Sequence, residues 1–199
     1  MATATSSRLL AAAALVAMLA LAGCGGAARQ DGGHAGGAPA RFAWLRPAAA
    51  PADWKIGRLP SGTAAVGYPP GWHSIRTDPG TFSAALLGAH DRIRGYLNAT
   101  PRSGAETLAN WNSFRPAHNT DEGDRNVIRE ASASGLRFRS GTGSCVIDRY
   151  GTTTHARYRE IACIVRGARA TTVVVAAARP ADWTRLAPQL ERAVASFST

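Results

Sequence analysis

Arginine is the residue type in this 199-residue chain with the clearest capacity for binding chemistry. The chain has 23 Lys or Arg residues against 13 Asp or Glu residues, a formal charge of +10, and only Lys55 among the basic residues is not arginine. Several arginines alternate along predicted strands, so their guanidinium groups would share one sheet face and could bind phosphate or carboxylate bidentately. The candidate anion-binding residues are Arg92, Arg94, Arg157 and Arg159, from a wider set with Arg76, Arg137 and Arg139.

A generic basic surface is the simpler interpretation of these arginines, because strand alternation alone produces such rows. The preference for Arg over Lys, with abundant Ala and Gly, is typical of a GC-rich genome. The high charge is therefore weak evidence for nucleic acid, and we expect no nucleic-acid partner.

Catalytic chemistry has few candidates. Ser144, Asp148 and His155 could form a hydrolase site only if the fold brings them together, since the sequence has no G-x-S-x-G elbow at Ser144. We expect no catalytic residues, no metal and no cofactor, and keep a cell-surface hydrolase as the alternative.

The N-terminus indicates export. Residues 9–21 are Leu, Ala, Val and Met only, a core too short for a stable membrane span but typical of a signal peptide. The motif Leu21-Ala22-Gly23-Cys24 that follows resembles the bacterial lipobox. The resemblance implies that Cys24 is acylated, becomes the first residue of the mature chain, and anchors it to the outer side of the cell membrane.

The remaining chain divides by composition. Residues 24–51 are rich in Gly, Ala and Pro and predict a flexible tether after the 1–23 signal peptide. Phe42, Trp44 and Leu45 are its apolar residues, and docking on the chain's own domain is their favoured use. Residues 52–199 form the expected folded domain.

Two cysteines remain once Cys24 is lipidated. Outside the cytoplasm we expect Cys145 and Cys163 to form a disulfide, although a zinc site with His155 is a weak alternative. A simple hairpin that pairs them would set Arg149 against Arg159.

The same hairpin would set Asp148 against Glu160. Like charges directly opposite are unfavourable, so we expect a bulge or a register shift instead. Asp148 and Glu160 themselves are interpreted as an exposed, salt-bridged surface pair.

The elements that position these residues follow from periodicity and turn residues. The expected strands are 64–68, 72–76, 82–87, 92–97, 127–133, 136–139, 145–150, 156–165 and 171–178. The run at 171–178 is apolar or β-branched throughout, which indicates a central strand covered on both faces.

Two helices are expected. Ser103 and Glu106 have capping-box spacing ahead of an aromatic stripe, which predicts a helix over 104–115 that ends at Pro116. Pro188 is expected in the first turn of the final helix, after a short turn at 182–186. Strands, a helix, more strands and a helix give an α+β fold with an antiparallel sheet packed by helices.

The motif Tyr68-Pro-Pro-Gly-Trp72, the Thr100-Pro101 pair ahead of a helix, and a C-terminal stripe resemble the PsbP-like extracytoplasmic lipoproteins. The stripe is Trp183, Leu186, Pro188, Leu190, Ser196 and Phe197. The resemblance spans about 64–197 and implies an α/β/α sandwich that acts as a non-catalytic binding or assembly module. The metal and chloride roles of the photosystem members are not carried over, because their residues have no counterpart identified in this sequence.

These observations predict a membrane-anchored, extracytoplasmic lipoprotein. It would act as a binding or adaptor module for an envelope component, a protein partner or a small anionic ligand. Its contact with the membrane would be the lipid on Cys24.

Overall fold

The computed structural model describes residues 39–199. The expected signal peptide, the lipid site at Cys24 and the first part of the expected tether lie outside the described residues. Among residues 39–199, no helix combines the length and the apolar character that a membrane crossing requires.

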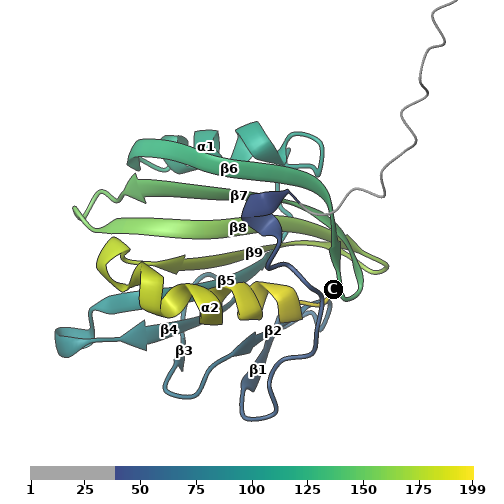
Figure 1. Ribbon diagram of the computed structural model, residues 1–199, viewed down its shortest axis with the longest axis horizontal. Helices are drawn as coiled ribbons and strands as arrows, with labels where there is room; N and C mark the ends of the chain where they lie inside the picture. The colour runs from purple at the N-terminus through teal and green to yellow at the C-terminus, as the bar shows by residue number, and fades with distance from the viewer. Residues whose placement is uncertain (1–38) are drawn as a thin grey trace, which may run out of the picture. The chain divides into compact units, whose positions relative to one another are not determined.

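A seven-stranded antiparallel sheet forms the centre of the domain (Figure 1). Its strand order is β3-β4-β5-β9-β8-β7-β6, and a separate pair, β1-β2, lies beside it. The strands are β1 Lys55–Arg58, β2 Ala65–Tyr68, β3 His73–Ile75, β4 Phe82–Leu87, β5 Ile93–Pro101, β6 Arg125–Phe138, β7 Gly141–Gly151, β8 Arg157–Gly167 and β9 Thr171–Ala178. Short 3-10 turns occupy Ala40–Phe42 and Ala89–Asp91.

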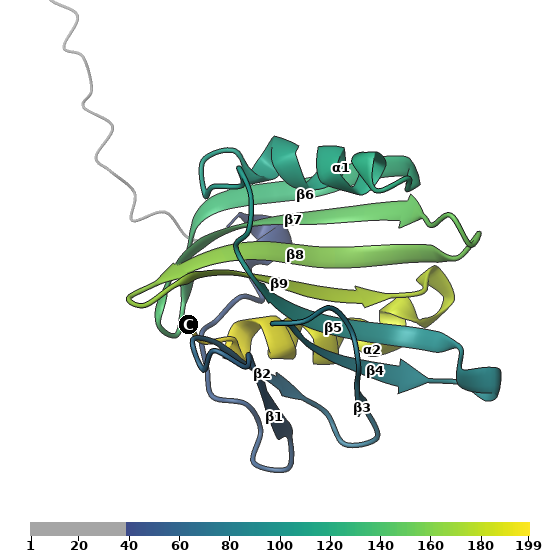
Figure 2. The same cartoon turned by 180° about the vertical axis from the view of Figure 1, so that it is seen from behind.

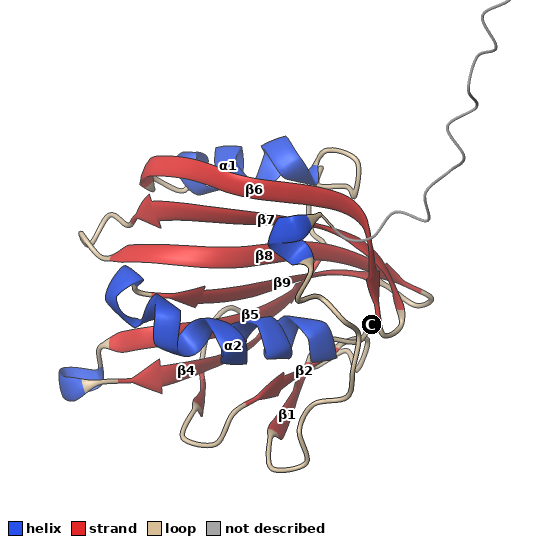
Figure 3. Ribbon diagram, in the orientation of Figure 1, coloured by secondary structure: helices blue, strands red, loops and turns tan. Residues whose placement is uncertain are grey.

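Two helices cover opposite faces of this sheet. Helix α2 (Pro180–Ser196) packs on the face seen in Figure 1, and α1 (Trp111–Asp121) packs on the other face, across β6, β7 and β8 (Figures 2 and 3). β9 is the middle strand, and seven of its eight residues are buried. The expected central strand and the α+β fold are confirmed.

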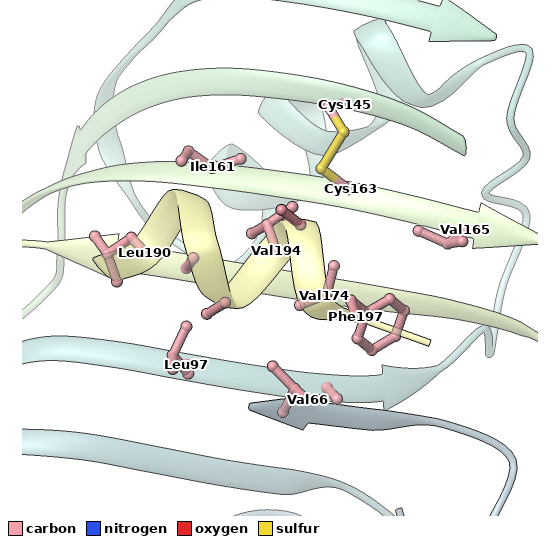
Figure 4. Packing of buried hydrophobic residues seen from close by; sticks show 14 of the residues in the cluster. Val66, Leu97, Cys145, Ile161, Cys163, Val165, Val174, Leu190, Val194 and Phe197 are labelled. Carbon is pink, nitrogen blue, oxygen red and sulfur yellow. A yellow bond between two sulfur atoms is a disulfide. The ribbon is translucent and has the colours of Figure 1, made fainter. Parts of the chain in front are cut away.

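The larger core lies between the sheet and α2. It joins Val66, Leu97 and Val174 to Leu190 and Phe197, with the Cys145–Cys163 disulfide at its margin (Figure 4). A smaller core on the opposite face centres on Trp111, whose indole N–H donates to the Ala162 carbonyl at 2.9 Å. Each face of the sheet therefore buries its own apolar cluster, as expected for a sheet that is covered by a helix on both sides.

The Tyr68–Trp72 turn fixes one corner of the larger core. Gly71 has φ +83°, a conformation that favours glycine, and the Trp72 N–H closes the turn on the Pro69 carbonyl at 3.3 Å. Trp72 is buried against Gly95 of β5, where a Cβ would lie 2.7 Å from the indole ring. The motif therefore serves packing.

Helix α1 lies later in the chain than its capping-box signal predicts. Glu106 does accept from the Ser103 N–H at 2.8 Å, but the helix starts at Trp111 and continues past Pro116. Proline removes the hydrogen bond to the carbonyl four residues earlier, on Asn112. Arg129 of β6 donates to that carbonyl at 2.5 Å, so tertiary structure replaces the lost bond.

The final helix is also longer than expected. It is continuous from Pro180, and Pro188 lies inside it rather than in its first turn. Pro188 is on the exposed side of the helix, where the carbonyl of Thr184, also exposed, can bond to water instead. The helix therefore continues through Pro188 instead of ending there.

The packed chain begins before the expected boundary at residue 52. Phe42 is fully buried and Leu45 is 7% exposed, and Ala48 donates to the Ala195 carbonyl of α2 at 3.1 Å. The apolar residues within 40–45 therefore dock on the chain's own domain, and the described part of the expected tether, residues 39–51, belongs to the folded unit.

Candidate functional site

The β7–β8 hairpin carries the residues on which the candidate site is built. Cys145 lies directly opposite Cys163, with a disulfide between them and a Cα–Cα distance of 4.1 Å. The pairing continues without a break from Gly141↔Gly167 to Gly151↔Arg157. The expected disulfide is confirmed, so both sulfurs are unavailable as zinc thiolates, and the expected bulge or register shift is wrong.

The unbroken register places two like-charge pairs side by side. Asp148 is opposite Glu160, and Arg149 is opposite Arg159. Because successive residues of a strand point to opposite faces, the acidic pair faces α1 and the basic pair faces α2. Each pair needs a compensating group from another element.

The acidic pair is buried under α1, contrary to the expected exposed surface pair. Both carboxylates are fully buried. Arg115 of α1 donates to both Glu160 oxygens, at 2.7 and 3.1 Å, and Tyr150 donates to Glu160 at 3.0 Å. Asn119 of α1 reaches both acids at 3.5 Å. One cation and two neutral donors therefore serve two acids.

The surroundings of the two acids shift their pKa values in opposite directions. Burial, followed by the charge of Glu160, raises the pKa of Asp148 to about 8. Burial acts upward on Glu160 too, but the charge and hydrogen bonds of Arg115 outweigh it and lower the Glu160 pKa. Asp148 is therefore neutral at pH 7 and Glu160 ionised, so a proton removes the repulsion.

The basic pair is compensated by Glu130 of β6. The Glu130 carboxylate lies 2.6 Å from Arg159 Nη2 and 3.7 Å from Arg149 Nε. Trp183 of α2 adds a second contact, with the guanidinium carbon of Arg159 4.5 Å from the centre of its ring. One carboxylate and one aromatic face therefore hold two arginines together.

A groove of about 690 Å³ opens at this basic pair. Its wall combines the arginines with aromatic and apolar side chains. The lining residues are Asn126, Ile128, Glu130, Arg149, Tyr150, Gly151, Arg157, Tyr158, Arg159, Pro180, Trp183 and Thr184. Three arginines against one glutamate leave the lining a net charge of +2.

The groove also carries an exposed apolar side chain. Ile128 is 44% exposed, one of two large hydrophobic residues at the surface of residues 39–199. Arg157 is also part of the groove lining, and it makes no ion pair within residues 39–199. The arrangement suits a ligand with an anionic group joined to an apolar or aromatic part.

The four arginines expected to bind anions do not come together. Arg157 and Arg159 line the groove, whereas Arg92 and Arg94 line a separate hollow of about 300 Å³. There Arg94 pairs bidentately with Asp182 of α2, and that hydrogen bond lowers the Asp182 pKa. Arg94 is thus committed to holding α2 on β5.

The hydrolase residues are not brought together either. Ser144 is buried and donates to the Leu108 carbonyl at 2.6 Å, and Asp148 lies in the cluster under α1. His155 is in the exposed turn after β7, at least seven residues along the strand from Ser144, or about 20 Å at 3.3 Å per residue. These three residues cannot act as a triad in this structure.

Sequence reasoning missed most of the groove. Glu130 and Ile128 carried no signal, and Trp183 was assigned to the core stripe of the last helix. Arg149 did carry a signal in the sequence, because the simple hairpin register that pairs the cysteines sets Arg149 against Arg159. That signal was interpreted as an argument against the register, whereas it marks a paired basic site.

No protein-family model matches this chain, and no curated protein sequence matches it. Among solved structures, the chain is similar to cyanobacterial PsbP (CyanoP) from Synechocystis sp. PCC 6803. The TM-score is 0.52 at 13% identity, over 75% of this chain and 94% of that protein. This likeness shows the PsbP-like fold and confirms the expected α+β sandwich.

Two weaker likenesses involve other bacterial proteins. The first is a Pseudomonas aeruginosa protein of unknown function, PA94, described as a putative regulator, with a TM-score of 0.48 at 12% identity over 72% of this chain and 94% of that one. The second is LpqN of Mycobacterium tuberculosis, described as involved in cell envelope biogenesis, with a TM-score of 0.38 at 12% identity over 75% and 79% of the two chains.

Proposed function

We propose that this protein is a non-catalytic, extracytoplasmic binding module, moored to the cell membrane through Cys24. Its groove on the α2 face of β6, β7 and β8 takes an anionic ligand with an apolar or aromatic part. The observation that carries the proposal is the set of arginines on the β7–β8 hairpin, placed beside Trp183 and Ile128 in one groove.

The chemistry of the groove supports this ligand class. A guanidinium group offers paired donors that match the oxygens of carboxylate or phosphate. The Trp183 ring covers one face of Arg159, which leaves the edges of that guanidinium for hydrogen bonds. Apolar surface at Ile128 and at the ring of Trp183 would cover the remainder of the ligand.

Small naphthalene compounds test the groove directly. The probes are 2-naphthyl phosphate and 2-naphthoate, which separate phosphate from carboxylate, and neutral 2-naphthylmethanol as the uncharged match. Binding is followed by NMR at the indole N–H of Trp183. Both anions should shift this signal at concentrations where the alcohol does not, and equal shifts by the alcohol would refute anion binding.

Arg157→Gln supplies the matched variant. Removing a charged donor from the groove should weaken 2-naphthyl phosphate binding by about tenfold. Arg58→Gln, an exposed arginine on β1 outside the groove, controls for the change in net charge and should change affinity less than twofold. Equal effects of the two variants would contradict the assignment of the groove.

The anchor is tested separately. The Cys24→Ser variant should lose metabolic labelling by fatty acid and accumulate as uncut precursor. Mass spectrometry of the wild-type protein should find Cys24 acylated at the mature N-terminus. Normal processing of Cys24→Ser would refute the anchor and leave the groove proposal to its own test.

A further inference from the structure

Glu130 is positioned by an irregularity in β6. The β6–β7 register passes from Arg129↔Asp148 to Ala131↔Ile147, so Glu130 is the extra residue of a β-bulge and has no partner on β7. Bulges turn a side chain away from its regular direction and are common beside functional sites. Here the bulge presents the Glu130 carboxylate to Arg149 and Arg159.

The contact between Glu130 and the arginines is incomplete. Arg159 uses Nη2 toward Glu130, while its Nε is buried and has no hydrogen-bond partner within residues 39–199. Arg149 is at 3.7 Å, longer than a hydrogen bond. Two arginines with paired donors are thus served by one carboxylate with one short contact.

An unsatisfied buried donor favours exchange of its partner. A guanidinium binds an oxyanion best through two parallel N–H···O bonds, and a buried donor without an acceptor costs free energy. Glu130 is tethered to β6 and provides one short bond. A free carboxylate or phosphate group has no such tether and can align with the Nε and Nη2 edge of Arg159.

We propose that Glu130 is an internal competitor that occupies the position of the ligand's anionic group, and that the ligand binds by displacing it. Glu130 therefore sets the affinity threshold of the groove, since an anion must bind the two arginines better than this carboxylate does. The inference rests on the proposed function, because it concerns the same groove and the same class of ligand.

Calorimetric titration with 2-naphthyl phosphate tests the inference in the folded protein. Glu130→Gln keeps the shape of the side chain but removes the competing charge, and should bind the probe about three- to tenfold more tightly than wild type. Glu122→Gln makes the same change at an exposed position directly after α1, where the carboxylate faces His118, and should change affinity less than twofold.

A different sign would overturn the competitor role. If Glu130→Gln binds the probe equally or more weakly than wild type, then Glu130 holds Arg159 in place rather than competing for it. The proposed function is still supported in that case if wild type binds the anions and Arg157→Gln binds them more weakly. Absence of binding by both wild type and Glu130→Gln would instead reject the groove itself.

A measurement on the wild-type chain avoids dependence on any variant. With ¹³C-labelled glutamate, the Glu130 carboxylate signal, assigned by its loss in Glu130→Gln, reports whether this group leaves the arginines. Saturation with 2-naphthyl phosphate should move that signal, while the Glu122 signal stays in place. A Glu130 signal that stays unchanged at saturation would show that the ligand binds without displacement, which contradicts the inference.

Discussion

Two neighbouring rows of the β7–β8 ladder meet the same electrostatic problem in different ways. Asp148↔Glu160 and Arg149↔Arg159 are consecutive like-charge pairs on opposite faces of the sheet. The acidic row is sealed under α1, where Arg115 and a retained proton neutralise it. The basic row lies open at the groove, where Glu130 offsets part of its charge.

The difference teaches where this fold can bind a ligand. A buried row has to be balanced within the protein, because an uncompensated charge there is costly. An open row can keep an excess of charge, since water and salt screen it. The covered row should therefore control stability, and the open row should control binding with little effect on stability.

Removal of Arg115 should give the largest effect. Arg115→Met leaves Glu160 buried without its cation, so the free energy of unfolding should fall by about 3–5 kcal/mol. Urea denaturation at pH 7 measures this loss, with Arg166→Met, an exposed arginine on β8, as the matched control. A loss below 1 kcal/mol would show that the acidic row does not depend on α1.

Removal of the disulfide should have the second-largest effect on stability. The disulfide holds the β7–β8 register in which the two acids and the two arginines face each other. The bridged cysteines are 18 residues apart, and closing such a loop is worth about 3 kcal/mol in the loop-entropy model. The Cys145→Ala/Cys163→Ala variant should lose this amount in urea denaturation. Equal stability of the variant and the oxidised wild type would mean that pairing alone fixes the register.

Asp148→Asn should raise the free energy of unfolding instead of lowering it, and the size of the gain should depend on pH. The pKa of Asp148 is raised from 3.8 to about 8 in the folded chain, so the folded state holds a proton that the unfolded chain releases. The stability due to this proton is present below about pH 4 and is lost as the pH rises through about 8.

Asparagine keeps a donor toward Glu160 and cannot ionise. The free energy of unfolding of the variant should therefore exceed that of wild type by about 2 kcal/mol at pH 9, and the difference should shrink toward pH 5. Urea denaturation across this pH range gives the comparison, and Asp53→Asn, an exposed position, is the control. A constant difference between Asp148→Asn and wild type would contradict the buried proton.

The smallest effect is expected in the open row. Arg149→Gln removes a repulsion with Arg159 and a long contact with Glu130 at 3.7 Å, two terms of opposite sign on a 58% exposed side chain. The free energy of unfolding should change by less than about 0.5 kcal/mol. A change above 1.5 kcal/mol in either direction would remove the distinction between the two rows.

Sequence predicted the strands better than the helices. The strand at Phe82–Leu87 and the central strand at Thr171–Ala178 have the bounds expected for them. A run of branched and apolar residues favours a buried strand through the residue types of the segment itself. Helix α1 could not be placed in the same way. It extends past Pro116 because Arg129, on a later strand, bonds the carbonyl that the proline leaves free.

Part of the candidate site was also visible in the sequence. Arg157 and Arg159 were expected as anion-binding residues and do line the groove. Their separation from Arg92 and Arg94 was not visible, because it depends on which strands lie between them in the sheet. Trp183 packs against the larger core, as its helical spacing predicts, but the spacing does not show that its ring also lies on Arg159.

Local composition determined the fold class, the apolar centre of the sheet and the pairing of Cys145 with Cys163. These properties depend on residue types within short segments and on the count of cysteines. The tertiary structure alone decided which charged row is covered and which is open. The groups that balance each row come from distant segments, such as Arg115, which is 45 residues from Glu160, and no short-range pattern encodes that meeting.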